Sequence, residues 1–281
     1  MQKLAFYPRL STPDLHLVRA PGPGLGNLLF PWARALMLAE RDDGHLISPT
    51  WRNIKLGPIL RRERDLRIYS DLFLHRHPRV LLSDLIIKLF PSEKIDEDEY
   101  LRNPRPALVV IEGTGRHFAN LTGAGPLLRK RLTSMTLLPP KNRIDGIAMH
   151  IRTGDFGEHI EATYRRNSRV AVSWFVEEAK WLRQQLGDQP ITIFTDDSTG
   201  AVRQAFSRVH NLSFANSGTA IHDILMMASA KHIVCSNSTF SLWAAFLSEA
   251  TFSARFPELF SDYEFDSQIL QNRLLSSPLC K

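Results

Sequence analysis

The chain has 281 residues, 43% of them hydrophobic and 23% charged, with a net charge of +6 and a pI near 9.5. This composition excludes disorder and coiled coil as the main architecture, and the length allows one large domain or two modest ones. The positive charge favours anionic partners, while no stretch is apolar enough for a signal peptide or a membrane span.

The first half begins with a predicted strand, Leu15–Val18, and a glycine-rich turn that leads into a helix. The turn, Gly22–Asn27, contains Gly24 and Gly26, but its spacing matches neither the dinucleotide-binding fingerprint nor a P-loop. Glycines after a strand let the backbone approach a ligand closely. Taken alone, a tight turn with Asn27 as the helix N-cap explains this segment more simply.

The middle of the chain is less regular and is basic. An amphipathic helix is predicted at Val80–Phe90 and a buried strand at Leu108–Ile111. Arginines concentrate in Arg61–Arg67 and Arg76–Arg79, for which a solvated face is the simplest interpretation. Leu138–Asp145 combines two prolines with polar residues and predicts a linker.

The second half alternates between short apolar runs and helical patterns. Strands are predicted at Gly146–Arg152, Pro190–Thr195, Leu212–Ala215 and His232–Cys235, and helices at Ser173–Leu186, Ser198–Val209, Ala220–Lys231 and from about Phe240. Such alternation predicts an α/β fold with a parallel sheet and ligands at the carboxyl ends of its strands. Two Rossmann-like halves joined near residue 140 suggest a GT-B arrangement, with domains 1–140 and 141–281 facing across a cleft.

The hexapeptide His150–Asp155 ends the first strand of the second half. On a strand, His150 and Arg152 point to the same side. A guanidinium at this place could bind pyrophosphate through two hydrogen bonds and neutralise charge on a departing nucleoside diphosphate. An ion pair between Arg152 and Asp155 that only pins the turn is an equally good interpretation.

Two adjacent carboxylates, Asp196 and Asp197, end the next strand. They could chelate Mg²⁺, accept hydrogen bonds from a ribose or a guanine, or cap the following helix. Adjacent residues of a strand face opposite ways, so joint chelation would require a turn. We favour recognition of the base or ribose by one of the two.

A run of four small polar residues, Ser236–Thr239, separates the last predicted strand from an aromatic-rich helix. One cap residue would suffice to begin that helix. The run, together with Ser241, exceeds this need, and free amide groups at a helix N-terminus suit a diphosphate. We therefore favour ligand binding by Asn237, Ser238, Thr239 and Ser241.

Other chemistries find little support in the residue pattern. Cys235 and Cys280 are far apart and fit neither a disulfide framework nor a zinc site. The ten histidines form no HExxH motif or zinc-like cluster, and no Gly-x-Ser-x-Gly elbow occurs. We expect a protein of a reducing, cytoplasmic compartment with no bound metal.

Four segments, in this order, resemble the bacterial and animal α-1,2-fucosyltransferases of glycosyltransferase family 11. Gly24–Asn27 with Phe30 looks like that family's GLGNQ-F motif, and His150–Asp155 matches its H-x-R-x-G-D motif. Phe194–Asp197 resembles its F-S-D-D element. Asp223–Phe246 is similar to a family segment that ends in S-N-S-T-F-S-W-W-A-A-W.

This resemblance implies an inverting GT-B enzyme that transfers L-fucose from GDP-β-L-fucose and needs no metal. It implies that Arg152 holds the diphosphate and assists its departure. Further contacts to the donor or acceptor are implied for Gly24, Gly26, Asn27, Asp196, Asp197, Ser238, Thr239 and Ser241. The N-terminal domain would lie on the acceptor side and the C-terminal domain would bind the nucleotide sugar.

The general base must reach the acceptor hydroxyl through one hydrogen bond or one water. Four candidates lie in or shortly after the predicted strand Gly146–Arg152: Asp155, His150, Glu158 and Glu161. We favour Asp155, whose alternative role is to orient Arg152. Without a strong base, stabilisation of the leaving group would carry most of the transfer.

The chain departs from the family's pattern at Leu28, Pro31, Trp32 and Leu242, which leaves the acceptor and the sugar open. We predict a fucosyltransferase that acts on an oligosaccharide or lipid-linked glycan of the cell surface, with its basic amphipathic middle segment in peripheral contact with an anionic inner membrane. One alternative is a transferase for another GDP-sugar. Another is a non-catalytic nucleotide or nucleic-acid binder, although the chain lacks the interleaved aromatics of an RNA-binding face, so nucleic acid is not a predicted partner.

Overall fold

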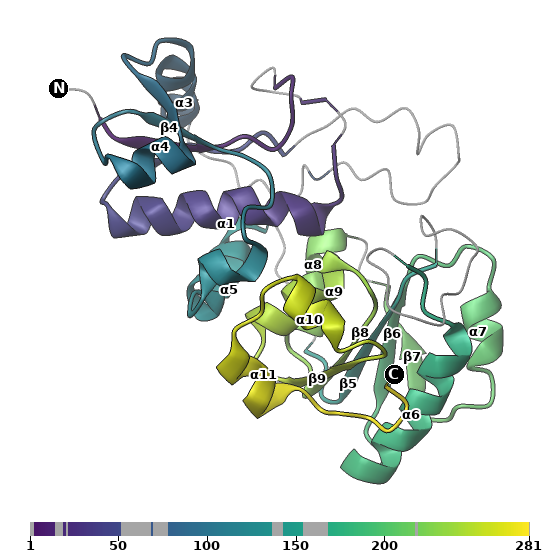
Figure 1. The fold of residues 1–281 in the computed structure, drawn as a ribbon. Coiled ribbons are helices and arrows are strands. Elements are labelled where there is room, and N and C mark those ends of the chain that lie inside the picture. Colours follow the sequence, from purple (N-terminus) through teal and green to yellow (C-terminus); the bar gives the residue numbers. More distant parts are fainter. Residues whose placement is uncertain are drawn as a thin grey trace. The chain divides into compact units, whose positions relative to one another are not determined.

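The computed structural model describes residues 3–14, 19–20, 22–51, 69, 78–136, 143–153, 168–216 and 219–280. The chain divides into two compact units, Met1–Leu137 and Leu138–Lys281, each built on its own sheet (Figure 1). Both sheets are parallel in every pairing, which confirms the predicted α/β class. Among the described residues, no helix is long and apolar enough to cross a membrane.

The N-terminal unit contains a four-stranded sheet in the order β2-β1-β4-β3. Its strands are β1 (Ala5–Pro8), β2 (His45–Leu46), β3 (Lys94–Asp96) and β4 (Leu108–Ile111). Every residue of the central strands β1 and β4 is buried, as a parallel sheet covered on both faces requires. Helix α1 (Leu25–Arg41) packs Ala35 and Leu38 on one face, and Ile87 of α3 (Pro78–Leu89) packs against the core of the other.

The C-terminal unit contains a five-stranded sheet in the order β7-β6-β5-β8-β9. Its strands are β5 (Ile147–Ile151), β6 (Ile191–Thr195), β7 (Leu212–Phe214), β8 (His232–Cys235) and β9 (Thr251–Ala254). The helices α6 (Val172–Leu186) and α9 (Thr239–Leu247) bury Phe175 and Trp243 completely. The remaining described helices are α4 (Glu97–Arg102), η2 (His117–Leu121), α5 (Gly125–Met135), α7 (Ala201–Ala205), α8 (Ala220–Met227), α10 (Glu258–Asp262) and α11 (Ser267–Arg273).

The order of the C-terminal strands places a switch point beside the central strand β5. From β5 the chain adds β6 and then β7 on one side, and then crosses back to add β8 and β9 on the other. In sheets of this type, ligands bind outside the carboxyl ends of the strands where the direction of winding reverses. The ends of β5, β6 and β8 are therefore the place to look for a site.

Several local predictions differ from the structure. The expected strand Leu15–Val18 lies outside the described residues, whereas β1, β2, β3 and β9 were not predicted. Asn27 is not the N-cap of α1, because the helix begins at Leu25 with Gly24 as its cap. Ser198 is not the N-cap of α7 either; Gly200 takes that position in a left-handed conformation with a φ of 83°, and Asp197 accepts the first amide hydrogen bonds.

Candidate functional site

Three polar segments from distant parts of the chain meet at the carboxyl edge of the C-terminal sheet. Strand β5 pairs with β6 on one side and with β8 on the other, side by side in Figure 1. His150 lies within β5 and Arg152 directly follows it, while Asp196 follows β6 and Ser236 follows β8. Register alone therefore brings the predicted residues His150, Arg152 and Asp196 to one edge beside the polar loop.

His150 is buried beneath the loop that follows β8. Its Nδ1 lies 2.7 Å from the Ser236 hydroxyl, and its ring stacks on Phe240 with centroids 5.1 Å apart. Burial, reinforced by the charge of Arg152, lowers the pKa of His150 from 6.5 to about 3. The imidazole is therefore neutral in the physiological range, and it joins the central strand to the loop across the switch point.

Arg152 and Asp196 form the charged part of the edge. Arg152 Nε lies 3.8 Å from Asp196 Oδ2, and 22% of the arginine side chain is exposed. Asp196 Oδ1 accepts hydrogen bonds from the Thr153 amide at 2.6 Å and from its hydroxyl at 3.1 Å. The carboxylate thus holds the turn after β5 in place while it neighbours the guanidinium.

The loop between β8 and α9 is held by its own serines. Ser241 Oγ donates to the carbonyl oxygens of Ser236 and Ser238 at 3.2 and 3.1 Å, and Ser238 caps α9 by accepting the Phe240 amide. Asn237 is buried, and its Nδ2 donates to Ser168 Oγ at 2.9 Å. Its Oδ1 has no hydrogen-bond partner within the described part of the chain. Buried acceptors of this kind are rare and mark places where a ligand or water is expected.

Asp197 takes a different direction from its neighbour. Its carboxylate accepts hydrogen bonds from the Thr199 amide and hydroxyl and from the Val202 amide, at 2.9, 2.6 and 2.7 Å. Burial acts to raise the pKa of Asp197, but these hydrogen bonds outweigh it and hold the pKa below its usual range. Of the two adjacent acids, Asp197 fixes the start of α7 and Asp196 faces the arginine.

The other predicted binding residues lie elsewhere or are not described. Gly24, Gly26 and Asn27 belong to the N-terminal unit, at the start of α1. Gly24 has a φ of −66°, and a Cβ there would meet no atom within 4 Å, so neither strain nor crowding requires a glycine. Asp155 lies outside the described residues, as do the alternative bases Glu158 and Glu161.

Sequence reasoning missed three residues that shape the edge. Thr153 binds Asp196, Ser168 binds Asn237, and Phe240 stacks on His150. Thr153 stands inside the conspicuous hexapeptide and was within reach of prediction. Ser168 carries no local pattern, since only tertiary structure brings it to the loop. Among the described residues, no group of three or more His, Cys, Asp or Glu side chains is placed to hold a metal.

Comparisons with known proteins give weak global and stronger local similarity. The crystal structure of the α-1,6-fucosyltransferase NodZ co-crystallized with GDP matches with a TM-score of 0.43 at 10% identity, over 88% of this chain and 93% of that chain. POFUT1 in complex with GDP gives 0.43 at 12%, over 88% and 95%. Because both TM-scores lie below 0.5, neither structure is used to assign the fold. The fold assignment depends on the strands described above.

A curated relative matches somewhat more than a third of the chain. The α-1,2-colitosyltransferase of Escherichia coli is 26% identical over 106 residues, which are 37% of this chain and 36% of that protein. The chain therefore aligns with about a third of this relative. The family model for glycosyl transferase family 11 matches residues 132–272, just over half of the chain, and this stretch contains the whole edge built from β5, β6 and β8. The chain belongs to glycosyl transferase family 11.

Proposed function

We propose that the chain is an inverting glycosyltransferase that moves L-fucose from GDP-β-L-fucose to a hydroxyl of a glycan, forming an α-1,2 linkage in surface polysaccharide synthesis. The observation that carries this proposal is a partly exposed arginine, Arg152, at the switch point of a parallel sheet in a member of family 11. The α-1,2 linkage is supported by the relative, which is an α-1,2-colitosyltransferase.

Departure of GDP is the step that this edge suits best. As the glycosidic bond breaks, negative charge grows on the β-phosphate, and a guanidinium placed there stabilises the transition state more than the ground state. The first turn of α9 adds amide groups and the positive end of a helix dipole. Ser238 and Thr239 complete the proposed diphosphate site, Ser241 is proposed to hold this loop from behind, and Asp196 is the proposed acceptor for the ribose or guanine.

Proton removal from the acceptor needs a second group. His150 is a poor candidate, because a base with a pKa of about 3 takes up a hydroxyl proton weakly near neutral pH. We assign His150 the part of a positioning residue that holds the Ser236 loop, and Asp155 that of the base. The N-terminal unit, with Gly24, Gly26 and Asn27, is proposed to serve the acceptor side, and metal independence and a cytoplasmic site of action belong to the same proposal.

A second donor is favoured by one observation, the colitosyltransferase name. Colitose is fucose without its 3-hydroxyl group, so a pocket for one sugar is nearly a pocket for the other. Removal of a single hydroxyl changes discrimination strongly only where the site hydrogen-bonds it. GDP-colitose is therefore the alternative donor to compare with GDP-fucose.

The experiment is a donor panel in the presence of a chelator. GDP-fucose, GDP-colitose, GDP-mannose and UDP-galactose are incubated with the full chain, and release of free nucleotide and sugar is measured. Turnover of GDP-fucose above the other three, lost in Arg152→Ala, supports the proposal. Turnover of GDP-colitose in its place supports the alternative donor. No GDP-sugar turnover, or full activity of Arg152→Ala, would overturn the assigned site.

A further inference from the structure

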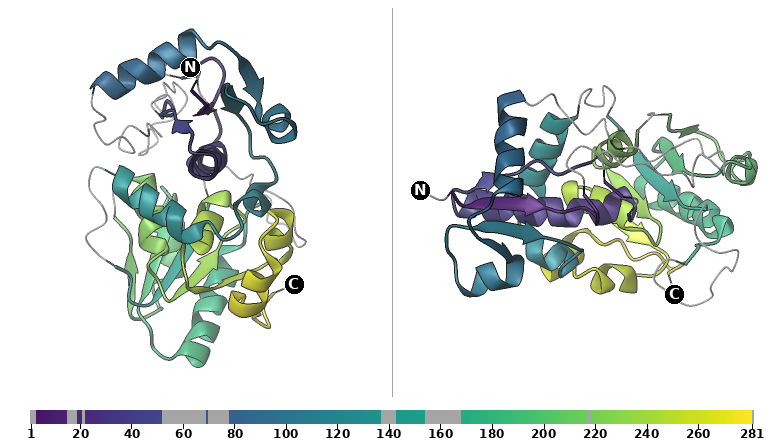
Figure 2. Two further views of the ribbon diagram at one scale, coloured as in Figure 1. Left: turned by 90° about the vertical axis from the view of Figure 1, so that its left-hand side faces the viewer. Right: turned by 90° about the horizontal axis from the view of Figure 1, so that it is seen from above.

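Helix α3 turns an uninterrupted apolar face to the outside. Figure 2 shows α3 along the outside of its unit. Large hydrophobic side chains that are exposed in this segment are Leu81 at 47%, Leu82 at 58%, Ile86 at 52%, Leu89 at 50% and Phe90 at 78%. The described chain has only two others, Leu101 and Leu186. Leu82, Ile86, Leu89 and Phe90 are spaced at three and four positions, so they share one side of the helix, and Leu81 adjoins them in the sequence.

Asp84 and Lys88 of α3 face the protein, whereas Ser83 is exposed. Asp84 is buried; its Oδ1 lies 2.6 Å from His45 Nε2, and its Oδ2 accepts the Ser48 amide at 3.0 Å. The Lys88 ammonium lies over the Tyr7 ring, 4.2 Å from its centroid. A helix at a protein–water boundary has the opposite arrangement, with apolar residues inward and charges outward. The outer face of α3 therefore suits a surrounding other than water.

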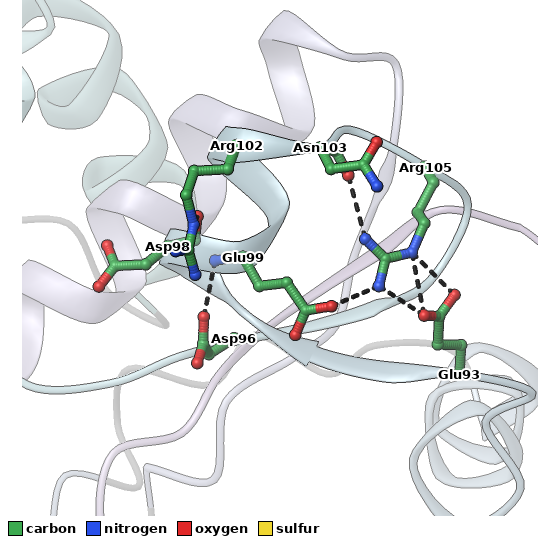
Figure 3. A network of polar contacts seen from close by, with 7 residues as sticks. All are labelled: Glu93, Asp96, Asp98, Glu99, Arg102, Asn103 and Arg105. Carbon is green, nitrogen blue, oxygen red and sulfur yellow. Dashed lines mark hydrogen bonds and ion pairs between the residues drawn. The ribbon is translucent and has the colours of Figure 1, made fainter.

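Helix α4 of the same unit shows the ordinary arrangement. Its exposed side and flanks carry charges that pair with one another (Figure 3). Arg105 donates to Glu93 at 2.6 Å and also pairs with Glu99, and Asp96 caps the helix by accepting the Glu99 amide at 2.8 Å. One unit thus presents a charged helix and an apolar helix, so the apolar face is a local property of α3.

We propose that the α3 face, defined as Leu81, Leu82, Ile86, Leu89 and Phe90, docks on the surface of an anionic lipid bilayer. The charge of the chain selects this occupant over a second copy, because two molecules of +6 repel each other whereas an anionic surface attracts each one. Asp84 is the single acid in the sequence 78–90, and it points inward, so no carboxylate of this helix opposes the lipid headgroups.

The mode of binding follows from the length of the helix. At 1.5 Å per residue, the 12 residues of α3 extend about 18 Å, well short of the hydrocarbon thickness of a bilayer. The helix therefore lies in the plane of the interface, with its leucines and Phe90 among the acyl chains. In the sequence, Arg76 and Arg79 stand just before and at the start of this segment, which is the kind of basic composition that anionic lipid attracts.

Vesicle flotation tests the proposal. The full chain is mixed with vesicles of phosphatidylglycerol and phosphatidylcholine, or of phosphatidylcholine alone. The wild type is expected to float with the anionic vesicles, and the triple variant Leu82→Gln/Ile86→Gln/Phe90→Gln to bind roughly tenfold more weakly or worse. The control Leu101→Gln/Leu186→Gln removes the exposed apolar side chains of α4 and α6 and is expected to bind as the wild type does.

A second readout separates insertion from simple charge attraction. An environment-sensitive fluorophore on Phe90→Cys, in a Cys280→Ser background, is expected to shift to the blue with anionic vesicles, whereas the same label on Leu101→Cys is not. Thermal unfolding confirms that each variant is folded.

Three outcomes would overturn the docking proposal. The first is a wild type that stays unbound. The second is binding unchanged by the triple variant, with no shift at position 90. The third is a dimer in gel filtration that only the triple variant dissociates, which would assign the α3 face to a second copy. None of these depends on the donor panel, so the docking and the transferase proposals fail separately.

Discussion

An arginine lies at the carboxyl edge of each sheet, and the two are placed very differently. In the N-terminal unit, Arg34 of α1 is 3% exposed and reaches the residues that follow β4. Its Nε lies 3.0 Å from both oxygens of Glu97, and its Nη groups donate to the carbonyls of Gly113 and Glu112 at 3.0 and 2.6 Å. In the C-terminal unit, Arg152 is 22% exposed and lies 3.8 Å from Asp196, beyond hydrogen-bond distance.

The difference fits a structural role for Arg34 and the binding role that we propose for Arg152. All three nitrogens of the Arg34 guanidinium bind groups of the protein, so its charge stabilises the fold. Arg152 keeps solvent access at the switch point, where an anionic ligand can reach it. We propose that the same residue type has a different role at each edge, and replacing each arginine by methionine tests this.

The largest expected effect is on stability, in Arg34→Met. The substitution leaves Glu97 and two backbone carbonyls without their donor, which costs about 3–5 kcal/mol of unfolding free energy. Arg152→Met is expected to change the unfolding free energy by less than about 1 kcal/mol. Urea unfolding followed by circular dichroism measures both variants. Equal destabilisation of the two would remove the distinction between the arginines.

The next effect is on catalysis, in Arg152→Met. If Arg152 stabilises the leaving diphosphate, kcat/KM for the donor falls about 100- to 1000-fold, the range seen when one transition-state donor is removed. Arg152→Lys keeps the charge but loses the paired geometry and is expected to fall between the two. Steady-state release of GDP provides the measurement. An Arg152→Met enzyme within tenfold of the wild type contradicts the assigned role.

A smaller pair of effects distinguishes the two adjacent acids. Asp196→Asn removes the charge beside Arg152 and is expected to raise KM for the donor about tenfold with little change in stability. Asp197→Asn weakens the cap of α7 and is expected to cost about 1 kcal/mol of stability with KM nearly unchanged. Donor kinetics and thermal unfolding of both variants check the prediction, which the reverse pattern would refute.

The last effect concerns pH and comes from His232, buried between Thr251 and Ser253. Burial lowers its pKa from 6.5 to about 4, so below about pH 6.5 the unfolded chain takes up a proton that the folded chain refuses. Stability therefore falls as the pH drops from about 6.5 toward 4, by up to about 1.4 kcal/mol per pH unit for this residue. The slope of unfolding free energy between about pH 7 and 5 should be smaller in His232→Asn. An unchanged slope would show that His232 does not contribute.

Much of the C-terminal fold could be predicted because its strands are short, apolar and buried on both faces. The sequences of β5, β6 and β8 are all short and mainly apolar. β9 was missed because its sequence, Thr-Phe-Ser-Ala, does not look like a core strand. Its Ser253 is nevertheless buried, since it bonds His232 and donates to Glu178 at 2.8 Å. A polar network that forms only after folding hides such a strand from the sequence.

The site was predictable in outline and not in detail. Strand ends carrying arginine, aspartate and a serine-rich run pointed to one edge, but the sequence could not tell which of Asp196 and Asp197 faces β5. Tertiary contacts decide this, because Asp196 binds Thr153 after β5 whereas Asp197 binds the residues at the start of α7. The low pKa of His150 likewise arises from burial beneath a loop 86 residues away, which no local pattern reveals.

The serine-rich loop after β8 has a consequence for how this enzyme family changes substrates. Its backbone carbonyls are already tied by Ser241, and Ser238 already caps the next helix. A preorganised wall of this kind binds without the entropy loss of ordering a flexible segment. If this loop binds the diphosphate as proposed, affinity for the shared nucleotide can stay constant while residues elsewhere adapt to a different sugar. Donor specificity should therefore be open to redesign without retuning this loop.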